Sequence, residues 1–204
     1  MWNYDILILE EGQAMDKKQL KPETFCYPMP CALVGANVNG KPNYLTVAWF
    51  SMANIKPPSL MVALNKSHYT NAGLKENGTF SVNVPSVAMA EVTDYCGLVS
   101  GKEHIKDNVF ETFYGKLKTA PMIKECPLSV ECKVVRTIDL QVDELFFGEI
   151  IAAYCDERYL TNDLPDLRKI APFILSISDR KYLTLGSEVG SAWNMGKKLI
   201  KKGT

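Results

Sequence analysis

Two adjacent prolines, Pro57 and Pro58, constrain the fold of this chain more than any other short segment. They separate Tyr44–Trp49, which is rich in aromatic and β-branched residues, from Leu60–Leu64, which is continuously apolar. Proline fixes φ and removes a backbone donor, so the pair locks a turn between the two segments. Because both segments have the composition and length of strands, we expect a strand, a tight corner and a second strand buried on both faces.

A cluster of polar residues follows the second strand. Asn65–Thr70 reads N-K-S-H-Y-T and leads into a short predicted helix within Ser67–Glu76, for which Ser67 is a candidate N-cap. Hydroxyls, a lysine and free backbone N–H groups at the start of a helix attract anions. The segment therefore suggests a phosphate site beside a strand on which a flat ring can lie. The alternative is a buried hairpin followed by a capped surface helix.

Turn residues separate further predicted elements. Asn39-Gly40 is a strong signal for a two-residue hairpin. Gln141–Tyr154 is long and apolar, but Gly148 within it favours a strand with a bulge or bend over a helix. The other expected strands are Cys31–Val38, Thr79–Val84, Thr112–Lys118, Leu128–Thr137 and Phe173–Ile177, and the other expected helices are Ser86–Val99 and Ser191–Lys202. This pattern predicts a mainly β, antiparallel barrel that is closed and therefore lacks exposed edges.

The composition narrows the classes of function. The 204 residues carry equal numbers of basic and acidic side chains, so the formal net charge is zero and nothing favours a nucleic-acid partner. No apolar run has the roughly 18 to 20 residues of a membrane-spanning helix, and the N-terminus lacks a signal peptide, so we expect no membrane contact and a cytoplasmic location. We expect an extension or edge strand in residues 1–14, one domain in 15–190 and a tail in 191–204.

The metal-ligating residue types are too few and too scattered for a metal site. The six cysteines form no C-x-x-C pair, and the chain has only two histidines, His68 and His104. In a reducing compartment, such cysteines are expected to be free thiols, most of them buried. We therefore predict neither a metal centre nor a disulfide.

The order of four short motifs resembles a known family. They are T-V-A-W-F-S at 46–51, the proline pair, S-H-Y-T-N-A-G-L-K-E-N-G-T-F-S-V-N-V-P at 67–85 and C-G-L-V-S-G-K at 96–102. This arrangement is similar to the flavin reductase-like, FMN-binding split-barrel family, and most similar to its flavoredoxin-type branch, over roughly residues 20 to 190. The resemblance implies a split β-barrel with short flanking helices, bound FMN, and a homodimer with the flavin near the subunit interface.

The resemblance also directs the choice of phosphate ligands. We expect the hydroxyls of Ser67 and Thr70 to bind the FMN phosphate, with Lys102 as the countercharge and Lys66 as a weaker candidate. Contacts to a charged phosphate are roughly twice as strong as neutral hydrogen bonds. The alternatives are that Ser67 only caps a helix and that Lys102 is a solvated loop lysine.

The ring of the flavin needs donors at its polar edge and shelter from water. The expected ring contacts are the backbone of Thr46, Val47, Ala48 and Trp49 and the side chain of Ser51, which would stabilise the reduced, anionic flavin. Trp49 could equally belong to the core. Further candidates, each with a purely structural alternative, are His68, Asn65, Asn83 and the thiol of Cys96. No side chain is assigned a catalytic role, because flavin chemistry belongs largely to the cofactor.

The resemblance favours an electron carrier that exchanges electrons between bound FMN and a redox partner protein. The first alternative is an NAD(P)H:flavin oxidoreductase, and both would be flavin-dependent oxidoreductases. A second alternative is a barrel that binds haem or another ligand without redox chemistry, for which His68 and His104 are the possible imidazole ligands. A pyridoxamine-phosphate-oxidase-like enzyme is disfavoured because all four arginines, Arg136, Arg158, Arg168 and Arg180, lie late in the chain.

Overall fold

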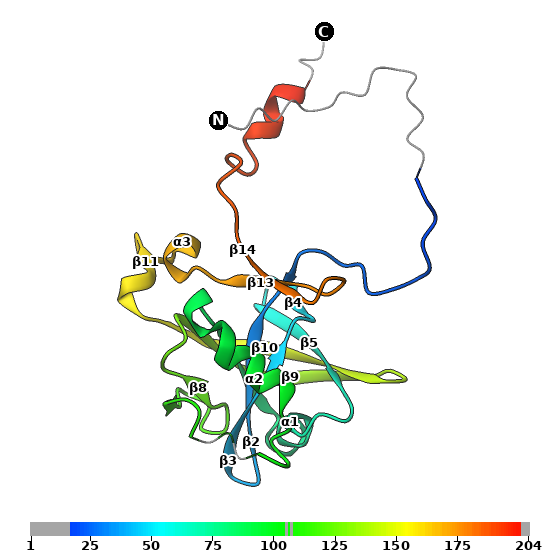
Figure 1. The fold of residues 1–204 in the computed structure, drawn as a ribbon. Helices are drawn as coiled ribbons and strands as arrows, with labels where there is room; N and C mark the ends of the chain where they lie inside the picture. The colour runs from blue at the N-terminus through cyan, green and yellow to red at the C-terminus, as the bar shows by residue number, and fades with distance from the viewer. Residues whose placement is uncertain (1–16, 105, 107, 201–204) are drawn as a thin grey trace.

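The computed structural model describes residues 17–104, 106 and 108–200 (Figure 1). Its centre is a seven-stranded sheet with the order β3-β2-β6-β9-β10-β5-β4, in which all neighbouring strands are antiparallel. The predicted antiparallel, mainly β fold is confirmed. The strands are β2 (Ala32–Val38), β3 (Lys41–Val47), β4 (Phe50–Asn54), β5 (Ser59–Asn65), β6 (Thr79–Val84), β9 (Leu128–Asp139) and β10 (Asp143–Cys155).

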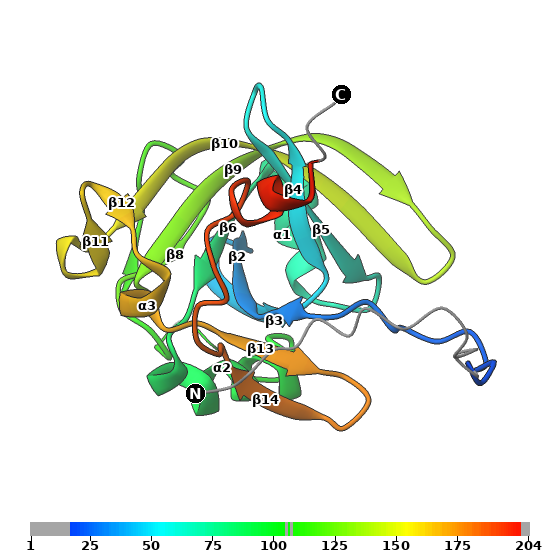
Figure 2. The same cartoon turned by 90° about the horizontal axis from the view of Figure 1, so that it is seen from above.

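A short connection brings the two ends of this sheet together. β3 and β4 stand at opposite ends of the strand order, yet only Ala48 and Trp49 separate them in sequence. The three Cα steps between the strands span at most about 11 Å, so the sheet curls into a barrel, as Figure 2 shows from above. Among the described strands, β3 pairs only with β2 and β4 only with β5. The expected closure is therefore incomplete, and the barrel is split between its two edges.

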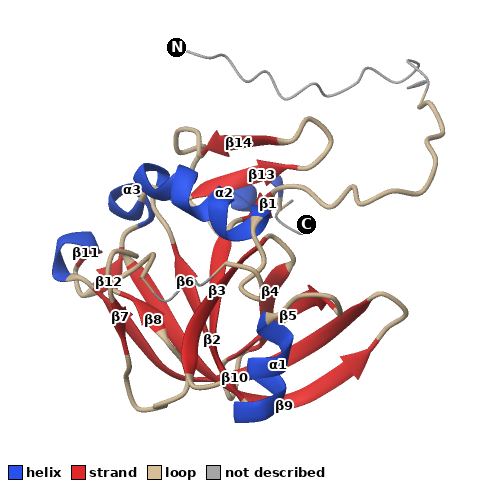
Figure 3. Ribbon diagram, turned by 60° about the horizontal axis from the view of Figure 1, so that its bottom comes forward, coloured by secondary structure: helices blue, strands red, loops and turns tan. Residues whose placement is uncertain are grey.

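Smaller elements surround the barrel. Figure 3 shows the helices as short segments around the strands; α1 lies against β2, and α2 lies against β3. The helices are α1 (Thr70–Asn77), α2 (Ala90–Leu98) and α3 (Leu167–Ile170), with short 3-10 turns η1 (Val87–Met89), η2 (Glu157–Tyr159) and η3 (Met195–Leu199). The remaining strands are β1 (Met29–Pro30), β13 (Phe173–Ser176) and β14 (Lys181–Thr184) in one sheet, β11 (Leu160–Thr161) with β12 (Leu164–Pro165), and β7 (Thr112–Phe113) with β8 (Met122–Ile123).

Two apolar clusters hold these layers together. The first fills the barrel, where Val34, Val62 and Phe146 are at most 1% exposed. The second lies on the outer side of β2 and β3, where Tyr44 of β3 and Cys96 of α2 belong to one buried cluster. Burial of each large apolar side chain contributes about 1.5 to 3 kcal/mol. These contacts therefore fix the position of α2 relative to β3, which both contribute residues to the lining of the candidate site.

Several local predictions are confirmed. Asn39 and Gly40 have φ values of 52° and 74°, which the two-residue turn between β2 and β3 requires. β10 is a strand, and its pairing with β9 shifts register between Phe147 and Gly148. A Cβ atom on Gly148 would lie 2.5 Å from the ring of Phe80, so close packing against this ring explains the glycine.

The limits of some elements were predicted wrongly. α1 begins at Thr70, with Tyr69 rather than Ser67 at its N-cap and no capping side chain. The segment predicted as a strand from Thr112 retains only two paired residues, because its chain turns away to reach β8. The helix predicted over 86–99 is split into η1 and α2, and the described part of the tail, residues 191–200, contains only the 3-10 turn Met195–Leu199. The predictions for residues 1–14 and 201–204 lie outside the described residues.

Candidate functional site

Two adjoining cavities open where β3 leaves the barrel. The first, which we call the strand cavity, has a volume of about 250 Å³ and is lined by Leu45, Thr46, Val47, Ala48, Trp49, Ala63, Leu64, Asn65, His68 and Asp143. The second, the loop cavity, has a volume of about 190 Å³ and is lined by Leu45, Ser67, His68, Tyr69, Thr70, Gly97, Leu98, Val99, Ser100, Gly101 and Lys106. Because Leu45 and His68 line both, the two cavities adjoin, and we call them together the depression.

The strand cavity exists because the barrel is split. β3 pairs with β2 along one edge only, so alternate backbone N–H and C=O groups on its other edge stay outside the ladder. Small residues such as Ala48 and Ala63 line the space beside this edge. The arrangement offers a planar ligand an apolar surface and backbone hydrogen-bonding groups at its border.

The wall formed by the turn before α1 is held by its own side chains. The Oδ1 atom of Asn65 accepts hydrogen bonds from the backbone N–H of Ser67 at 3.0 Å and from its hydroxyl at 2.7 Å. Such local bonds compete with helix capping, which explains why Ser67 is not the N-cap of α1. The next residue along the wall, Thr70, is 1% exposed, and its hydroxyl oxygen accepts from the Nδ2 atom of Asn43 at 2.7 Å.

The opposite wall is the loop that follows α2. A Cβ atom on Gly101 would lie 1.9 Å from the Oδ1 atom of Asn43. Because Asn43 is buried and bonded to Thr70, it cannot move aside cheaply. Glycine at position 101 therefore lets this loop approach the turn closely enough to form the narrow loop cavity.

A buried ammonium group lies at the base of the loop cavity. Lys106 is 3% exposed, and its Nζ atom donates to the carbonyl oxygens of Tyr44 at 3.0 Å and Cys96 at 2.8 Å. Burial lowers the pKa of Lys106, an effect that the Cys96 thiol opposes. No carboxylate of the described residues forms an ion pair with it. Of the three ammonium N–H groups, one is left for an anion in the cavity.

Sequence reasoning selected Lys102 and missed Lys106. Lys102 is exposed and lies outside the lining of both cavities, and its role as countercharge stays a prediction. Both lysines belong to one polar loop in the sequence, and no local signal separates them. The contacts of Lys106 with Tyr44 and Cys96 depend on how the loop folds back over α2 and β3.

The structure brings most of the other predicted site residues together. Ser67 and Thr70 line the loop cavity, and His68 lies between the two cavities. Ser51 lies in a neighbouring groove, where it lines the wall with Trp49. The predicted residues that line the strand cavity, besides His68, are Thr46, Val47, Ala48, Trp49 and Asn65.

Two predicted site residues are buried away from both cavities. Asn83 is fully buried, and its amide group bonds to the backbone of Leu33 and Ile123, each at 3.0 Å, and to the hydroxyls of Ser81 and Ser129. Cys96 is a fully buried residue of α2, and burial raises the pKa of its thiol to about 11. Such a thiol stays protonated at neutral pH and is a poor nucleophile.

The side chains of Thr46 and His68 give the strand cavity its polar character. The Thr46 hydroxyl donates to the carbonyl oxygen of Thr93 and so joins β3 to α2. Partial burial lowers the pKa of His68, and the positive charge of Lys106 acts in the same direction, whereas Asp143 raises it. His68 is therefore neutral at pH 7 in this arrangement, and its ring has both a donor and an acceptor nitrogen.

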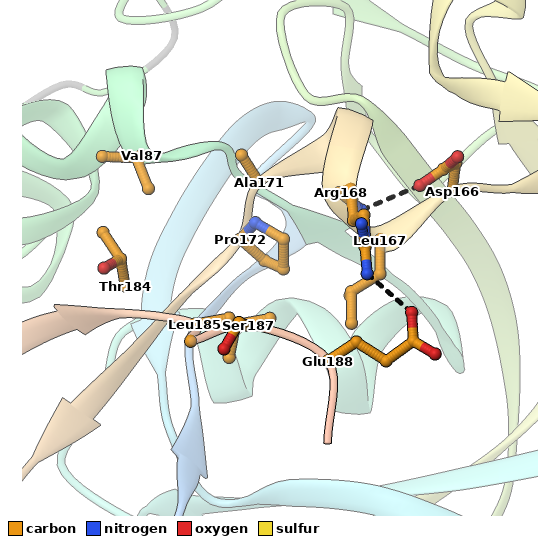
Figure 4. Close-up of a pocket in the computed structure, with 11 residues that line it drawn as sticks. Val87, Asp166, Leu167, Arg168, Ala171, Pro172, Thr184, Leu185, Ser187 and Glu188 are labelled. Atoms are coloured by element: carbon orange, nitrogen blue, oxygen red, sulfur yellow. Dashed lines mark hydrogen bonds and ion pairs between the residues drawn. The ribbon is translucent and has the colours of Figure 1, made fainter. Parts of the chain in front are cut away.

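A separate cavity lies at the other side of the fold, between α3 and the chain that follows β14 (Figure 4). It has a volume of about 660 Å³ and shares no lining residue with the strand and loop cavities. The Asp166 carboxylate accepts from backbone N–H groups of α3, and Arg168 pairs with Glu188 at 2.7 Å. These polar groups are already paired with each other, so this cavity is the weaker candidate for a polar ligand.

Two classes of site find no support in the described residues. No group of three or more His, Cys, Asp or Glu side chains within them is arranged to hold a metal ion. None of their helices combines the length and the apolar character that crossing a bilayer demands. All six cysteines are free thiols.

The fold and this depression agree with the family that the sequence motifs suggested. Residues 24–184 match the model of the flavin reductase like domain, and the chain belongs to this family. Within it, the chain lies in the flavoredoxin branch. It is 50% identical to the flavoredoxin of Methanosarcina acetivorans, with a TM-score of 0.89 and coverage of 91% of this chain and 100% of that one.

Two further proteins are similar to this chain. The flavoredoxin of Desulfovibrio vulgaris (Miyazaki F) is 33% identical, with a TM-score of 0.83 over 88% of this chain and 99% of that one. The FMN reductase (NADH) RutF of Acinetobacter baylyi is 27% identical over 150 residues, which are 66% of this chain and 78% of that protein. The predicted resemblance to the family and to its flavoredoxin branch is confirmed.

Proposed function

We propose that this chain binds FMN in the strand and loop cavities and carries electrons through it. The observation that supports this most directly is that the two cavities adjoin at Leu45 and His68. One end presents the free edge of a strand, and the other presents hydroxyls and a buried cation. A flat ring joined to a phosphate needs this pair of environments. Bound FMN would supply the electron transfer itself.

At the loop cavity, the residues that would hold the phosphate differ in whether a hydrogen-bond donor is free to reach it. The Thr70 hydroxyl accepts from Asn43, so its own proton is available for a ligand. The Ser67 hydroxyl donates to Asn65 and must redirect its proton to contact a phosphate. The third N–H of Lys106 adds a charge-assisted bond, which is roughly twice as strong as a neutral one. Thr70 and Lys106 are therefore the main phosphate ligands in this proposal.

At the strand cavity, the backbone of Thr46–Trp49 would border the ring. Preorganised N–H donors stabilise negative charge that develops when the ring is reduced. Trp49 is 40% exposed and lies at the cavity rim, where its side chain would shield the ring from water. Neutral His68 would orient the ligand without adding charge.

A second candidate function is that of an NADH:FMN oxidoreductase. The likeness to RutF, named as an FMN reductase (NADH), favours it. Anaerobic mixing of the purified protein with NADH, and separately with NADPH, distinguishes the two functions. Prompt bleaching of the flavin by either nucleotide contradicts a pure carrier, which accepts electrons from a redox partner protein instead.

We also propose that the protein is a homodimer. Met61 and Ala63 of β5 face outward and pair with Phe147 and Leu145 of β10, and all four side chains are only partly buried. Strands with apolar residues on both faces are typical of sheets covered on both sides. A second copy would cover this outer face. The six free thiols support a cytoplasmic location.

An absorbance spectrum of the protein as purified tests the proposal. An oxidised flavin absorbs in the visible region, and release of FMN when the protein is denatured identifies the cofactor. If the purified protein is colourless and added FMN keeps its full fluorescence, the protein does not bind FMN and the proposal is wrong.

A further inference from the structure

A large open groove adjoins the strand cavity, and Ala48 and Trp49 line both. The groove, which we call the entrance groove, has a volume of about 950 Å³ and lies between the segment before β1 and the chain from Ala48 to Ser51. Its apolar lining includes Phe25, Met29, Phe50 and Met61. A contiguous apolar surface of this kind marks a binding site for another molecule or chain segment.

The C-terminal tail, residues 185–200, exposes apolar side chains that could fill such a groove. It carries large apolar side chains that nothing covers: Trp193 is 95% exposed, Leu199 76% and Ile200 72%. The 3-10 turn η3 buries none of its residues, and Figure 1 shows the tail leaving the barrel beyond β14. A tryptophan buries about 150 to 250 Å² when it packs, so packing against a partner surface would stabilise the tail.

The tail and the groove wall lie toward opposite ends of the sheet β1-β13-β14. Thr184, the last residue of β14, pairs with Phe173 at the start of β13. Met29 pairs further along, with Leu175, and Tyr27 bonds to Ser178 beyond the end of β13. The groove wall before β1 therefore lies toward one end of this sheet, and the tail departs from the other.

An ion pair holds the beginning of the tail on that side. Glu188 pairs with Arg168 of α3 at 2.7 Å (Figure 4). The side chains of the tail that follow are cationic as well as apolar, with Lys197 and Lys198 in η3, and the entrance groove carries Glu23 on its wall. The charge of the tail therefore complements that of the groove.

We propose that the C-terminal tail of one copy packs into the entrance groove of a second copy, with Trp193 against the apolar lining beside Trp49. Exchange in a two-fold dimer is reciprocal, so each copy covers the other's groove. The tail would thus close the approach to the strand cavity, and a partner residue would complete the site. This inference rests on the proposed dimer and specifies which segment the partner contributes.

Disulfide trapping tests the exchange directly. Cys26 is exposed and lines the entrance groove, and Ser191 and Asn194 flank Trp193 in the sequence. The single variants Ser191→Cys and Asn194→Cys of the full chain are oxidised with diamide, which accepts the two electrons and two protons of the thiol pair. We expect at least one variant to form a covalent dimer on a non-reducing gel, and Cys26→Ser in the same background to abolish it.

Two outcomes overturn the proposal. If thiol groups are lost while the chain stays monomeric on the gel, the tail occupies the groove of its own copy. If neither variant forms a disulfide with Cys26, the tail does not enter the groove at all. Both outcomes are read without flavin, so a failure of FMN binding leaves this result unaffected.

A second measurement isolates the role of Trp193. In the cysteine variant that cross-links, Trp193→Ala should slow trapping about tenfold, because the loss of one buried large side chain corresponds to at least this factor in affinity. Leu164→Ala removes a comparably exposed apolar side chain, 68% exposed, from the β11–β12 hairpin, and should leave trapping unchanged. Equal effects of the two substitutions would contradict specific docking of Trp193.

Discussion

The ammonium group of Lys106 holds the carbonyl oxygen of Cys96 at 2.8 Å, near the C-terminal end of α2. Through its second bond, to Tyr44 at 3.0 Å, the same group ties α2 to β3. One side chain therefore positions two walls of the loop cavity and supplies its positive charge. A buried ammonium without a paired carboxylate is costly, and an anionic ligand in the cavity would offset that cost.

Replacement of this lysine should weaken FMN binding far more than replacement of the exposed one. For Lys106→Met we expect the affinity for FMN to fall at least about tenfold, because a hydrogen bond to a charged group contributes about 1.5 to 3 kcal/mol. Quenching of FMN fluorescence in a titration measures the affinity. Lys102→Met is the matched control, and a loss with this variant equal to that with Lys106→Met would contradict the assignment.

The hydroxyls of the turn before α1 provide a second test. The double variant Ser67→Ala/Thr70→Ala should bind FMN at least about tenfold more weakly, because both substitutions remove donors to a charged phosphate. Thr70→Ala alone should account for most of this loss, because the Ser67 proton is already donated to Asn65. Ser187→Ala, in the separate cavity beside α3, serves as the control. Unchanged affinity in the double variant would place the phosphate elsewhere.

Asn83 should act on stability. Asn83→Ala leaves the buried N–H of Ile123 and the carbonyl oxygen of Leu33 without the amide that bonds them, at a cost of about 3 kcal/mol in the free energy of unfolding. Urea denaturation measures this change, with the exposed Asn108→Ala as control. If Asn83→Ala retained full stability but lost FMN, a ligand role would replace the structural one.

The pKa of His68 predicts a specific pH dependence. Burial and the charge of Lys106 lower this pKa below its ordinary value of 6.5. Between the lowered pKa and 6.5, the unfolded chain binds more protons than the folded one, so stability rises with pH across this window and is complete above it. Conversely, stability falls as the pH drops below 6.5.

Urea denaturation at a series of pH values measures this effect. His68→Gln should remove the dependence in this window, whereas His104→Gln should retain it. An NMR titration of the His68 imidazole reads the same pKa directly. A midpoint above 6.5 in the ligand-free protein would show that burial does not dominate the environment of this side chain.

The candidate site was predictable to the extent that it lies within one continuous segment. Thr46–Trp49 and the turn with Ser67 and Thr70 belong to adjacent pieces of chain, and their polar and small residues were visible as a pattern. Lys106 was not predictable, because its contacts with Tyr44 and Cys96 cross 62 and 10 positions of sequence. Asn83 was predicted as a possible ligand but is a buried residue that bonds to other segments. The sequence does not distinguish these two roles for an asparagine at the end of a strand.

By itself, the sequence determined the class of fold. The fold class depends on local signals: turn residues such as Asn39-Gly40, the proline pair and the periodicity of apolar residues in strands. These signals specify hairpins independently of contacts with distant segments. Only the tertiary structure decided that the barrel stays split between β3 and β4, beside the strand cavity, and that the buried Lys106 lines the adjoining loop cavity. Both depend on which distant segments pack together, because burial and unpaired strand edges are properties of the assembled fold and not of neighbouring residues.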